Sequence, residues 1–147
     1  MRVEVDQSGK VEDLNTHTVV AYSNDLNGAI LIRAGAKQKI VSGLRKSITD
    51  SSELYATFFA VLVYILVKDL KASVFVIDEE YTGKEKLISE TIRKLFWVKK
   101  KKTVDLRFTP IGRHSNAHQV AWRTHLFKGK KFPVQRIKEQ EVFLLIR

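Results

Sequence analysis

The chain has 147 residues, of which 44% are hydrophobic and 29% are charged, a balance typical of a folded globular protein rather than a disordered one. It contains no cysteine, which excludes disulfides and thiolate metal sites and makes a cytoplasmic location the default expectation. The formal net charge of +10 favours polyanionic partners such as nucleic acid, but charge alone does not distinguish such a protein from a basic protein that binds none.

A membrane segment is not expected. The longest apolar stretch runs from Leu54 to Val67, broken only by Thr57, and its 14 residues are fewer than the about 20 that a helix needs to cross a bilayer. The first six residues carry a charge at every second position, where a secretory signal would be apolar. The apolar stretch is therefore better explained as a buried helix.

Strand patterns dominate the first forty residues. Apolar and charged residues alternate from Arg2 to Asp6, which predicts a strand with Val3 and Val5 on one face and Glu4 on the other. Runs rich in β-branched residues follow, separated by segments with turn composition. The further strands that we expect cover residues 16–22, 29–33 and 39–41, the last two as one arm bent around Gly35.

Helix and strand are expected to alternate after residue 50. Asp50 suits an N-cap, Glu53 lies three residues further on as in a capping box, and the helix continues through Val67. The tail over 141–147 is compatible with a strand or a helix. The order implies one α/β domain over residues 1–147, a mixed five-stranded sheet with a three-strand meander and helices packed on it. The remaining predicted elements are a strand over 73–77, a helix over 84–97, a strand over 104–110 and a helix over 115–127.

Three carboxylates are candidates for a metal site. Asp6 ends the first strand, Glu53 lies in the first turn of the long helix, and Asp78 ends the strand that follows. If the two strands are adjacent and parallel, their ends bring Asp6 and Asp78 together, and a helix packed on the sheet brings Glu53 near them. Close carboxylates repel one another unless a cation compensates, and Mg²⁺ or Mn²⁺ prefers oxygen ligands.

Each carboxylate also has a structural interpretation. Asp6 suits the start of the turn that follows it, and Glu53 suits the capping box alone. Asp78 begins an acidic run that is typical of a solvated loop, and we expect Glu79 and Glu80 on the surface. Glu4, on the same strand face as Asp6, is the substitute ligand.

The order of these motifs resembles that of the ribonuclease H-like superfamily. Its members place an Asp on the first strand in an Asp-x-Ser-like turn, a Glu near the start of the first helix and an Asp at the end of the fourth strand. A fourth ligand or proton-handling residue lies on a late helix in a short Asn, Ala, Asp/His pattern. The matching segments here are Val5-Asp6-Gln7-Ser8-Gly9, Glu53-Leu54-Tyr55-Ala56, Val76-Ile77-Asp78 and Arg113-His114-Ser115-Asn116-Ala117-His118-Gln119-Val120-Ala121.

The resemblance covers about residues 1–125 and maps His118 onto the late acidic position. The chain departs from the family in that histidine and in Val19–Tyr22, which lacks the glycines of the usual second strand. The resemblance implies a divalent-metal-dependent nuclease that hydrolyses phosphodiester bonds of RNA or an RNA/DNA hybrid. Asp6, Glu53 and Asp78 would be the Mg²⁺ or Mn²⁺ ligands, and His118 would act as a ligand or proton shuttle.

Two alternatives to a nuclease stay open, because fold does not fix function. One is a non-catalytic nucleic-acid-binding domain with a ribonuclease H-like fold. The other is a protein-interaction domain whose positive charge serves solubility. The expected nucleic-acid partner is RNA, an RNA/DNA hybrid or DNA.

Basic residues form two candidate nucleic-acid contacts. The run Lys99, Lys100, Lys101 and Lys102 follows an aromatic pair, a combination that suits a phosphate backbone with a stacked base. The same run suits a helix C-terminus, where cations are favourable. The second group lies near the expected metal corner and includes Arg113 and Arg123.

The late helix carries two further features. His114, His118 and His125 have a spacing that also suits zinc, which we keep as an alternative. Trp122 is expected to pack against the core rather than to serve as a stacking platform.

Overall fold

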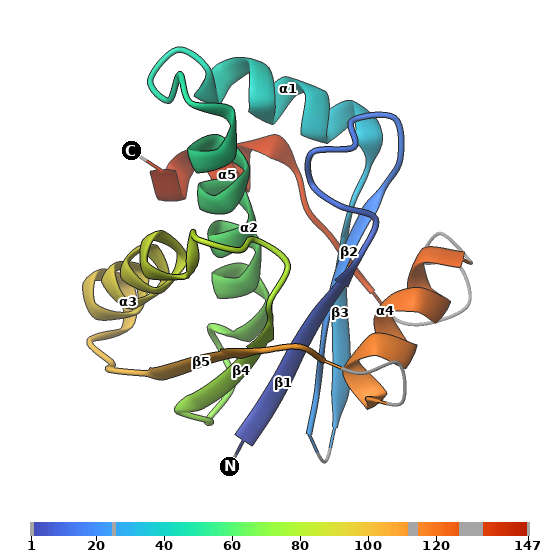
Figure 1. Ribbon diagram of the computed structural model, residues 1–147, viewed down its shortest axis with the longest axis vertical. Helices are drawn as coiled ribbons and strands as arrows, with labels where there is room; N and C mark the ends of the chain where they lie inside the picture. The colour runs from blue at the N-terminus through green and yellow to red at the C-terminus, as the bar shows by residue number, and fades with distance from the viewer. Residues whose placement is uncertain (1, 25, 112–114, 127–133, 147) are drawn as a thin grey trace.

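The protein forms a mixed β-sheet with helices on both faces (Figure 1). The computed structural model describes residues 2–24, 26–111, 115–126 and 134–146. Within these ranges the strands are β1 (Arg2–Ser8), β2 (Thr18–Ser23), β3 (Asn27–Ile32), β4 (Val74–Asp78), β5 (Asp105–Thr109) and β6 (Gln135–Arg136). The helices in the same ranges are α1 (Ala34–Leu44), α2 (Ser51–Val67), α3 (Glu85–Lys100), α4 (Asn116–Leu126) and α5 (Glu139–Ile146).

The strand order across the sheet is β5-β4-β1-β2-β3-β6. β1, β2 and β3 form the predicted antiparallel meander, whereas β4 pairs in parallel with β1 and β5 in parallel with β4. The expected α/β class and mixed sheet are therefore confirmed. β1 and β4 are adjacent and parallel, which is the condition on which the predicted approach of Asp6 to Asp78 depends.

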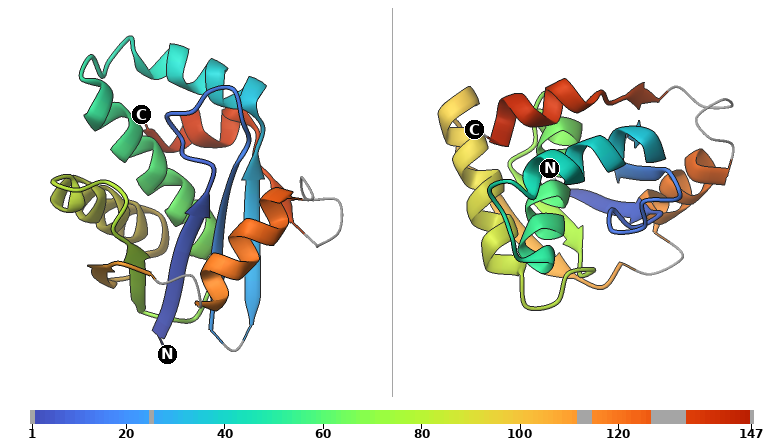
Figure 2. Two further views of the ribbon diagram at one scale, coloured as in Figure 1. Left: turned by 45° about the vertical axis from the view of Figure 1, so that its right-hand side comes forward. Right: turned by 90° about the horizontal axis from the view of Figure 1, so that it is seen from above.

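Side-chain alternation along β1 separates a large core from a small one. Val3 and Val5 pack into the cluster that contains α2, which is buried along most of its length. On the opposite face, Ala121 of α4 packs against β2 and β3 residues. Alanine has a short side chain, so α4 approaches the sheet closely, and Figure 2 shows α4 on the side of the sheet away from α2 and α3.

The start of α2 is as predicted. Asp50 is its N-cap, with a side-chain oxygen that accepts a hydrogen bond of 3.0 Å from the backbone N–H of Glu53. Side chains at the start of α2 are exposed, and the buried part begins at Leu54.

None of the helices in the described part of the chain combines the length and the apolar character needed to cross a membrane.

Two predictions in this part of the fold are wrong. Residues 39–41, expected as a strand, lie in α1, whose buried side chains recur at helical spacing, at positions 37, 40, 41 and 44. The sheet has a sixth strand, because β6 pairs in parallel with β3, and the backbone N–H of Ile137 donates to the Leu31 carbonyl at 2.9 Å. The tail that was compatible with either element is the helix α5.

Candidate metal centre

Adjacent strands bring Asp6 and Asp78 together. Val5 of β1 is in register with Ile77 of β4, and both side chains belong to the core on the α2 side. The next residue on each strand turns to the opposite face, because strand side chains alternate. One carboxylate oxygen from each of Asp6, Asp78 and Glu80 lies within 4.8 Å of the others. We call these three residues the acidic cluster.

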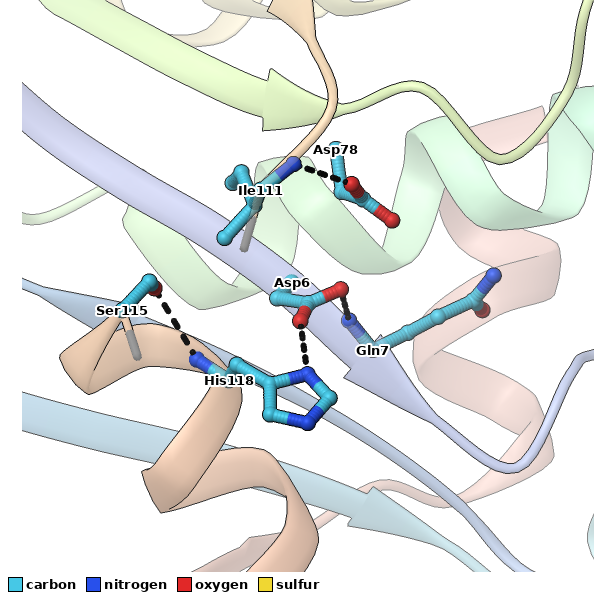
Figure 3. A network of polar contacts seen from close by, with 6 residues as sticks. All are labelled: Asp6, Gln7, Asp78, Ile111, Ser115 and His118. Atoms are coloured by element: carbon cyan, nitrogen blue, oxygen red, sulfur yellow. Dashed lines mark hydrogen bonds and ion pairs between the residues drawn. The ribbon is translucent and has the colours of Figure 1, made fainter. Parts of the chain in front are cut away.

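Asp6 is the buried member of the acidic cluster, with 2% of its surface exposed. Its Oδ1 accepts a hydrogen bond of 2.8 Å from the backbone N–H of Gln7, and its Oδ2 lies 2.9 Å from Nδ1 of His118 (Figure 3). Burial raises the pKa of Asp6 above its ordinary value, and the bonds to His118 and Gln7 partly offset that effect. The buried carboxyl is therefore held in one orientation by both of its oxygens.

His118 reaches Asp6 from the start of α4. Its backbone N–H donates to Oγ of Ser115 at 3.2 Å, and Ala117 beside it is buried against the sheet. These contacts direct the imidazole across the end of β1, and the second ring nitrogen, Nε2, points away from Asp6 (Figure 3). With Asp6 ionised, Nδ1–H donates to the carboxylate and Nε2 faces outward. The structure thus brings together Asp6 and Asp78, as the order of the elements predicts, and His118, as the resemblance implies.

Glu80 joins the acidic cluster through a tight turn after β4. Its backbone N–H donates to the Asp78 carbonyl at 2.9 Å, while Oδ1 of Asp78 accepts from the backbone N–H of Ile111 at 2.7 Å. Partial burial, a hydrogen bond with Asp78 and repulsion from that carboxylate raise the pKa of Glu80 to about 7. Nζ of Lys10, 4.0 Å from Glu80, opposes the shift.

Glu79 is exposed, as expected, whereas Glu80 is half-buried, with 26% of its side chain exposed. Glu80 lies two residues beyond Asp78, after β4 has ended, so strand alternation does not predict which side its carboxylate takes. The turn that brings them close cannot be read from composition alone.

The structure does not bring Glu53 to the acidic cluster. Glu53 is exposed in the first turn of α2, and its backbone N–H donates a hydrogen bond to Oδ1 of the N-cap residue Asp50. The physical reason is that α2 covers one face of the sheet, whereas Asp6 points to the face covered by α4. Glu4, the expected substitute, is also outside the cluster.

Searches with the chain find no matching protein-family model, no matching curated protein and no matching solved structure. The interpretation of the site therefore depends on its geometry.

The spacing of the three carboxylates is compatible with one divalent cation. Two ligand oxygens of one cation, each at 2.0–2.6 Å, are at most about 4–5 Å apart, so the upper limit of 4.8 Å within the acidic cluster is compatible with a shared cation. Carboxylate oxygens are also the ligand type that Mg²⁺ and Mn²⁺ prefer.

The zinc interpretation gains no support from His125. Its Nδ1 lies 3.0 Å from the Ser8 carbonyl oxygen and its Nε2 lies 3.4 Å from Oγ1 of Thr16, so both ring nitrogens already have partners. His114 lies outside the described residues. Among those described, the metal-capable group contains carboxylates only.

The four lysines predicted to contact nucleic acid at the end of α3 differ in how their side chains are engaged. Lys102 has a structural role, since its Nζ donates to the carbonyl oxygens of Leu70 and Ala72. Lys100 pairs with Asp69 at 3.0 Å, and Lys99, Lys100 and Lys101 are all exposed.

The basic group on and before α4 is only partly described. Arg123 is exposed on α4, and Arg113 lies outside the described residues. Trp122 on the same helix is 50% exposed, so the expectation that it packs into the core is wrong.

Proposed function

We propose that the protein is a divalent-metal-dependent nuclease of the ribonuclease H-like type, hydrolysing phosphodiester bonds of RNA or an RNA/DNA hybrid. The observation that carries the proposal is the convergence of Asp6, Asp78 and Glu80 beside His118. The order of the strands and helices and the net charge of +10 are consistent with it. In this proposal Glu80 takes the ligand role that the sequence assigned to Glu53.

The acidic cluster would hold Mg²⁺ or Mn²⁺. When bound, such an ion lowers the pKa of a water nucleophile and neutralises charge that develops on the phosphoryl group. Asp6 is fixed for this role by Gln7 and His118, and Asp78 by the backbone of Ile111. These fixed carboxylates cost little reorganisation when a cation binds.

His118 and Lys10 would complete the site. His118 keeps Nδ1 on Asp6 and presents Nε2 outward, where an imidazole can transfer a proton to or from the substrate. Lys10 places an exposed ammonium group 4.0 Å from Glu80, next to where a phosphate would approach the cluster. A cation at this position favours an anionic substrate over a neutral one.

A non-catalytic nucleic-acid-binding domain of the same fold is the second candidate. The observation that favours it is that His118 occupies Oδ2 of Asp6, where the family pattern has another carboxylate. In that case the acidic cluster would have lost its catalytic role, and only the exposed lysine and arginine residues would act, by binding nucleic acid.

A cleavage assay separates the two candidates. We would incubate the protein with labelled RNA/DNA hybrid, duplex RNA and single-stranded DNA, in Mn²⁺ or in EDTA. The nuclease proposal predicts cleavage of hybrid or RNA in Mn²⁺, loss of cleavage in Asp6→Asn and Asp78→Asn, and retention in Glu90→Gln, a change of an exposed carboxylate on α3.

Cleavage that persists in both cluster variants would refute the proposal. Salt-sensitive binding without cleavage would instead identify the binding domain.

A further inference from the structure

Trp97 is exposed where a helix side chain of its size is normally buried. It lies near the C-terminal end of α3 and is 55% exposed, while the next residue, Val98, is 52% exposed. The same helix buries Ile92 and Phe96 in the core. The packing of α3 therefore does not depend on the full indole ring, and because tryptophan is enriched at contact surfaces, Trp97 is a candidate contact residue.

The chain around Trp97 is strongly basic. Residues 91–102 contain six lysine or arginine residues and no aspartate or glutamate. Arg93 is one helical turn before Trp97, and Lys101 places its Nζ 5.7 Å from the centroid of the indole ring. Lys101 ends α3 in the left-handed conformation, with φ of 51°, a position at which glycine is usual.

A hollow of about 440 Å³ lies beside the indole ring. Arg93, Trp97, Thr103 and Val104 line it, together with Lys102, whose ammonium is bound to backbone carbonyls. The volume falls within the range of small-ligand sites. We call Arg93, Trp97 and Lys101 with this hollow the Trp97 surface.

Asp105 also lines the hollow, and its carboxylate is paired with a cation. Nε and Nη2 of Arg107 donate to its Oδ2 at 3.2 and 3.0 Å. The remaining charge on the surface is positive, and β5 is the edge strand of the described sheet, so no further strand lies against this side. The charge complement of the Trp97 surface is therefore a polyanion.

We propose that the Trp97 surface binds a single strand of nucleic acid, with an unpaired base stacked on Trp97 and backbone phosphates against Arg93 and Lys101. An aromatic ring stacks on any base, and the flanking cations hold the backbone, so the contact is tolerant of sequence. A base pair in a duplex keeps its faces stacked on its neighbours, which is why the occupant is single-stranded.

The surface is separate from the acidic cluster. Val74 pairs with Asp105 at the N-terminal end of β4, whereas Asp78 lies at the C-terminal end, about 13 Å along the strand. Figure 1 shows α3 and α4 on opposite sides of the molecule. The inference rests on the proposed function in treating the strand as part of the same substrate, but its binding can be measured without cleavage.

The two tryptophans of the chain make a direct test possible. Trp122→Phe leaves Trp97 as the sole indole, and Trp97→Phe leaves Trp122, which has a similar exposed fraction of 50%. Each protein is titrated in EDTA with oligothymidylate, with duplex DNA and with polyglutamate, while indole fluorescence is recorded. We expect oligothymidylate to quench Trp97 saturably, with weaker quenching by duplex DNA and none by polyglutamate.

Substitutions on α3 give the magnitude. Trp97→Ala should weaken oligothymidylate binding by about five- to a hundred-fold, the range that loss of one stacked base produces. Lys101→Gln should make the plot of log affinity against log salt concentration less steep, reducing the magnitude of its slope by about 0.7. Lys86→Gln, an exposed lysine at the other end of α3 that pairs with Glu90, should change neither. Circular dichroism would check that each variant is folded.

The proposal is overturned if Trp97 is not quenched, or if Trp97→Ala binds oligothymidylate as tightly as the wild type. Equal quenching by polyglutamate would also overturn it, since that result requires only charge. If the wild type shows no nuclease activity but Trp97 is still quenched, the proposed nuclease function fails and the Trp97 surface is supported. Quenching in Asp78→Asn equal to that of the wild type likewise supports the Trp97 surface independently of the acidic cluster.

Discussion

Removing the charge of Glu80 should stabilise the protein in the absence of metal. Its carboxyl lies close to those of Asp6 and Asp78, and its side chain is only 26% exposed. Burial and the hydrogen bond and repulsion from Asp78 raise the pKa of Glu80 from 4.5 to about 7. Glu80→Gln removes the charge and keeps a group that can donate a hydrogen bond to Asp78, as the protonated carboxyl does.

The magnitude follows from the pKa difference between the folded and unfolded states. Between pH 4.5 and about 7 the folded protein holds a proton on Glu80 that the unfolded chain has released. Stability therefore falls as the pH rises through this window, and the loss is complete above about 7. At about 1.4 kcal/mol for each pKa unit, and allowing for partial solvent screening, the loss is about 2–3 kcal/mol.

Urea unfolding in EDTA, followed at a pH well below 4.5 and again well above 7, measures this effect. At the higher pH we expect Glu80→Gln to unfold at a urea concentration about 1–2 M above that of the wild type, and at the lower pH the two should agree. Excess Mn²⁺ should stabilise the wild type more than the variant. Glu79→Gln, a change of the exposed neighbouring carboxylate, is the matched control. The reasoning is refuted if Glu80→Gln is no more stable than this control in EDTA at the higher pH.

Three further predictions concern Lys37, Gly9 and Glu53. Burial lowers the pKa of Lys37 from 10.5 to about 8, so the unfolded chain binds more protons between these values and stability should rise with pH there, by up to about 3 kcal/mol. Lys37→Met should abolish that rise in urea unfolding, whereas the exposed Lys39→Met should retain it. Gly9→Ala should cost about 1–3 kcal/mol in thermal or urea unfolding, because φ is +76° and the added Cβ would lie 2.2 Å from a backbone carbonyl oxygen. Gly35→Ala, with no atom within 4 Å of the new Cβ, should be neutral or stabilising by up to about 1 kcal/mol, and destabilisation there would contradict the packing. Glu53→Gln should leave Mn²⁺ affinity in calorimetry unchanged, and a large loss would restore its place as a ligand.

Much of the architecture follows from local patterns in the sequence. The alternation from Arg2 to Asp6 and the apolar run of α2 specify their elements without reference to distant residues. The pairing of β1 with β4 follows from the order of the elements, because a strand, a long crossover and a second strand favour a parallel pair. The same logic predicts that Asp6 and Asp78 meet, and they do.

The errors have identifiable physical causes. The Ile40-Val41 pair between two glycines has strand composition, but burial at positions 37, 40, 41 and 44 favours a helix. β6 has two residues, too few to leave a periodic signal, and it depends on pairing with the distant β3. Secondary structure that tertiary pairing stabilises is not encoded locally.

The sequence predicts only some of the residues of the site, because the others depend on tertiary structure. Glu53 has the right spacing along the chain, but the face that α2 covers is a tertiary property. Glu80 enters the acidic cluster through a turn whose closing bond joins its own N–H to the Asp78 carbonyl. Lys102 belongs to a basic run in the sequence, yet its ammonium is bound by carbonyls that follow α2.

The central claim is that the acidic cluster binds a divalent cation, and a Mn²⁺ titration followed by electron paramagnetic resonance of the unbound ion tests it most directly. The account predicts a saturable site in the wild type that is lost in Asp78→Asn and retained in Asp105→Asn, with both variants folded. Equal Mn²⁺ binding by the wild type and Asp78→Asn, or none by the wild type, would contradict it.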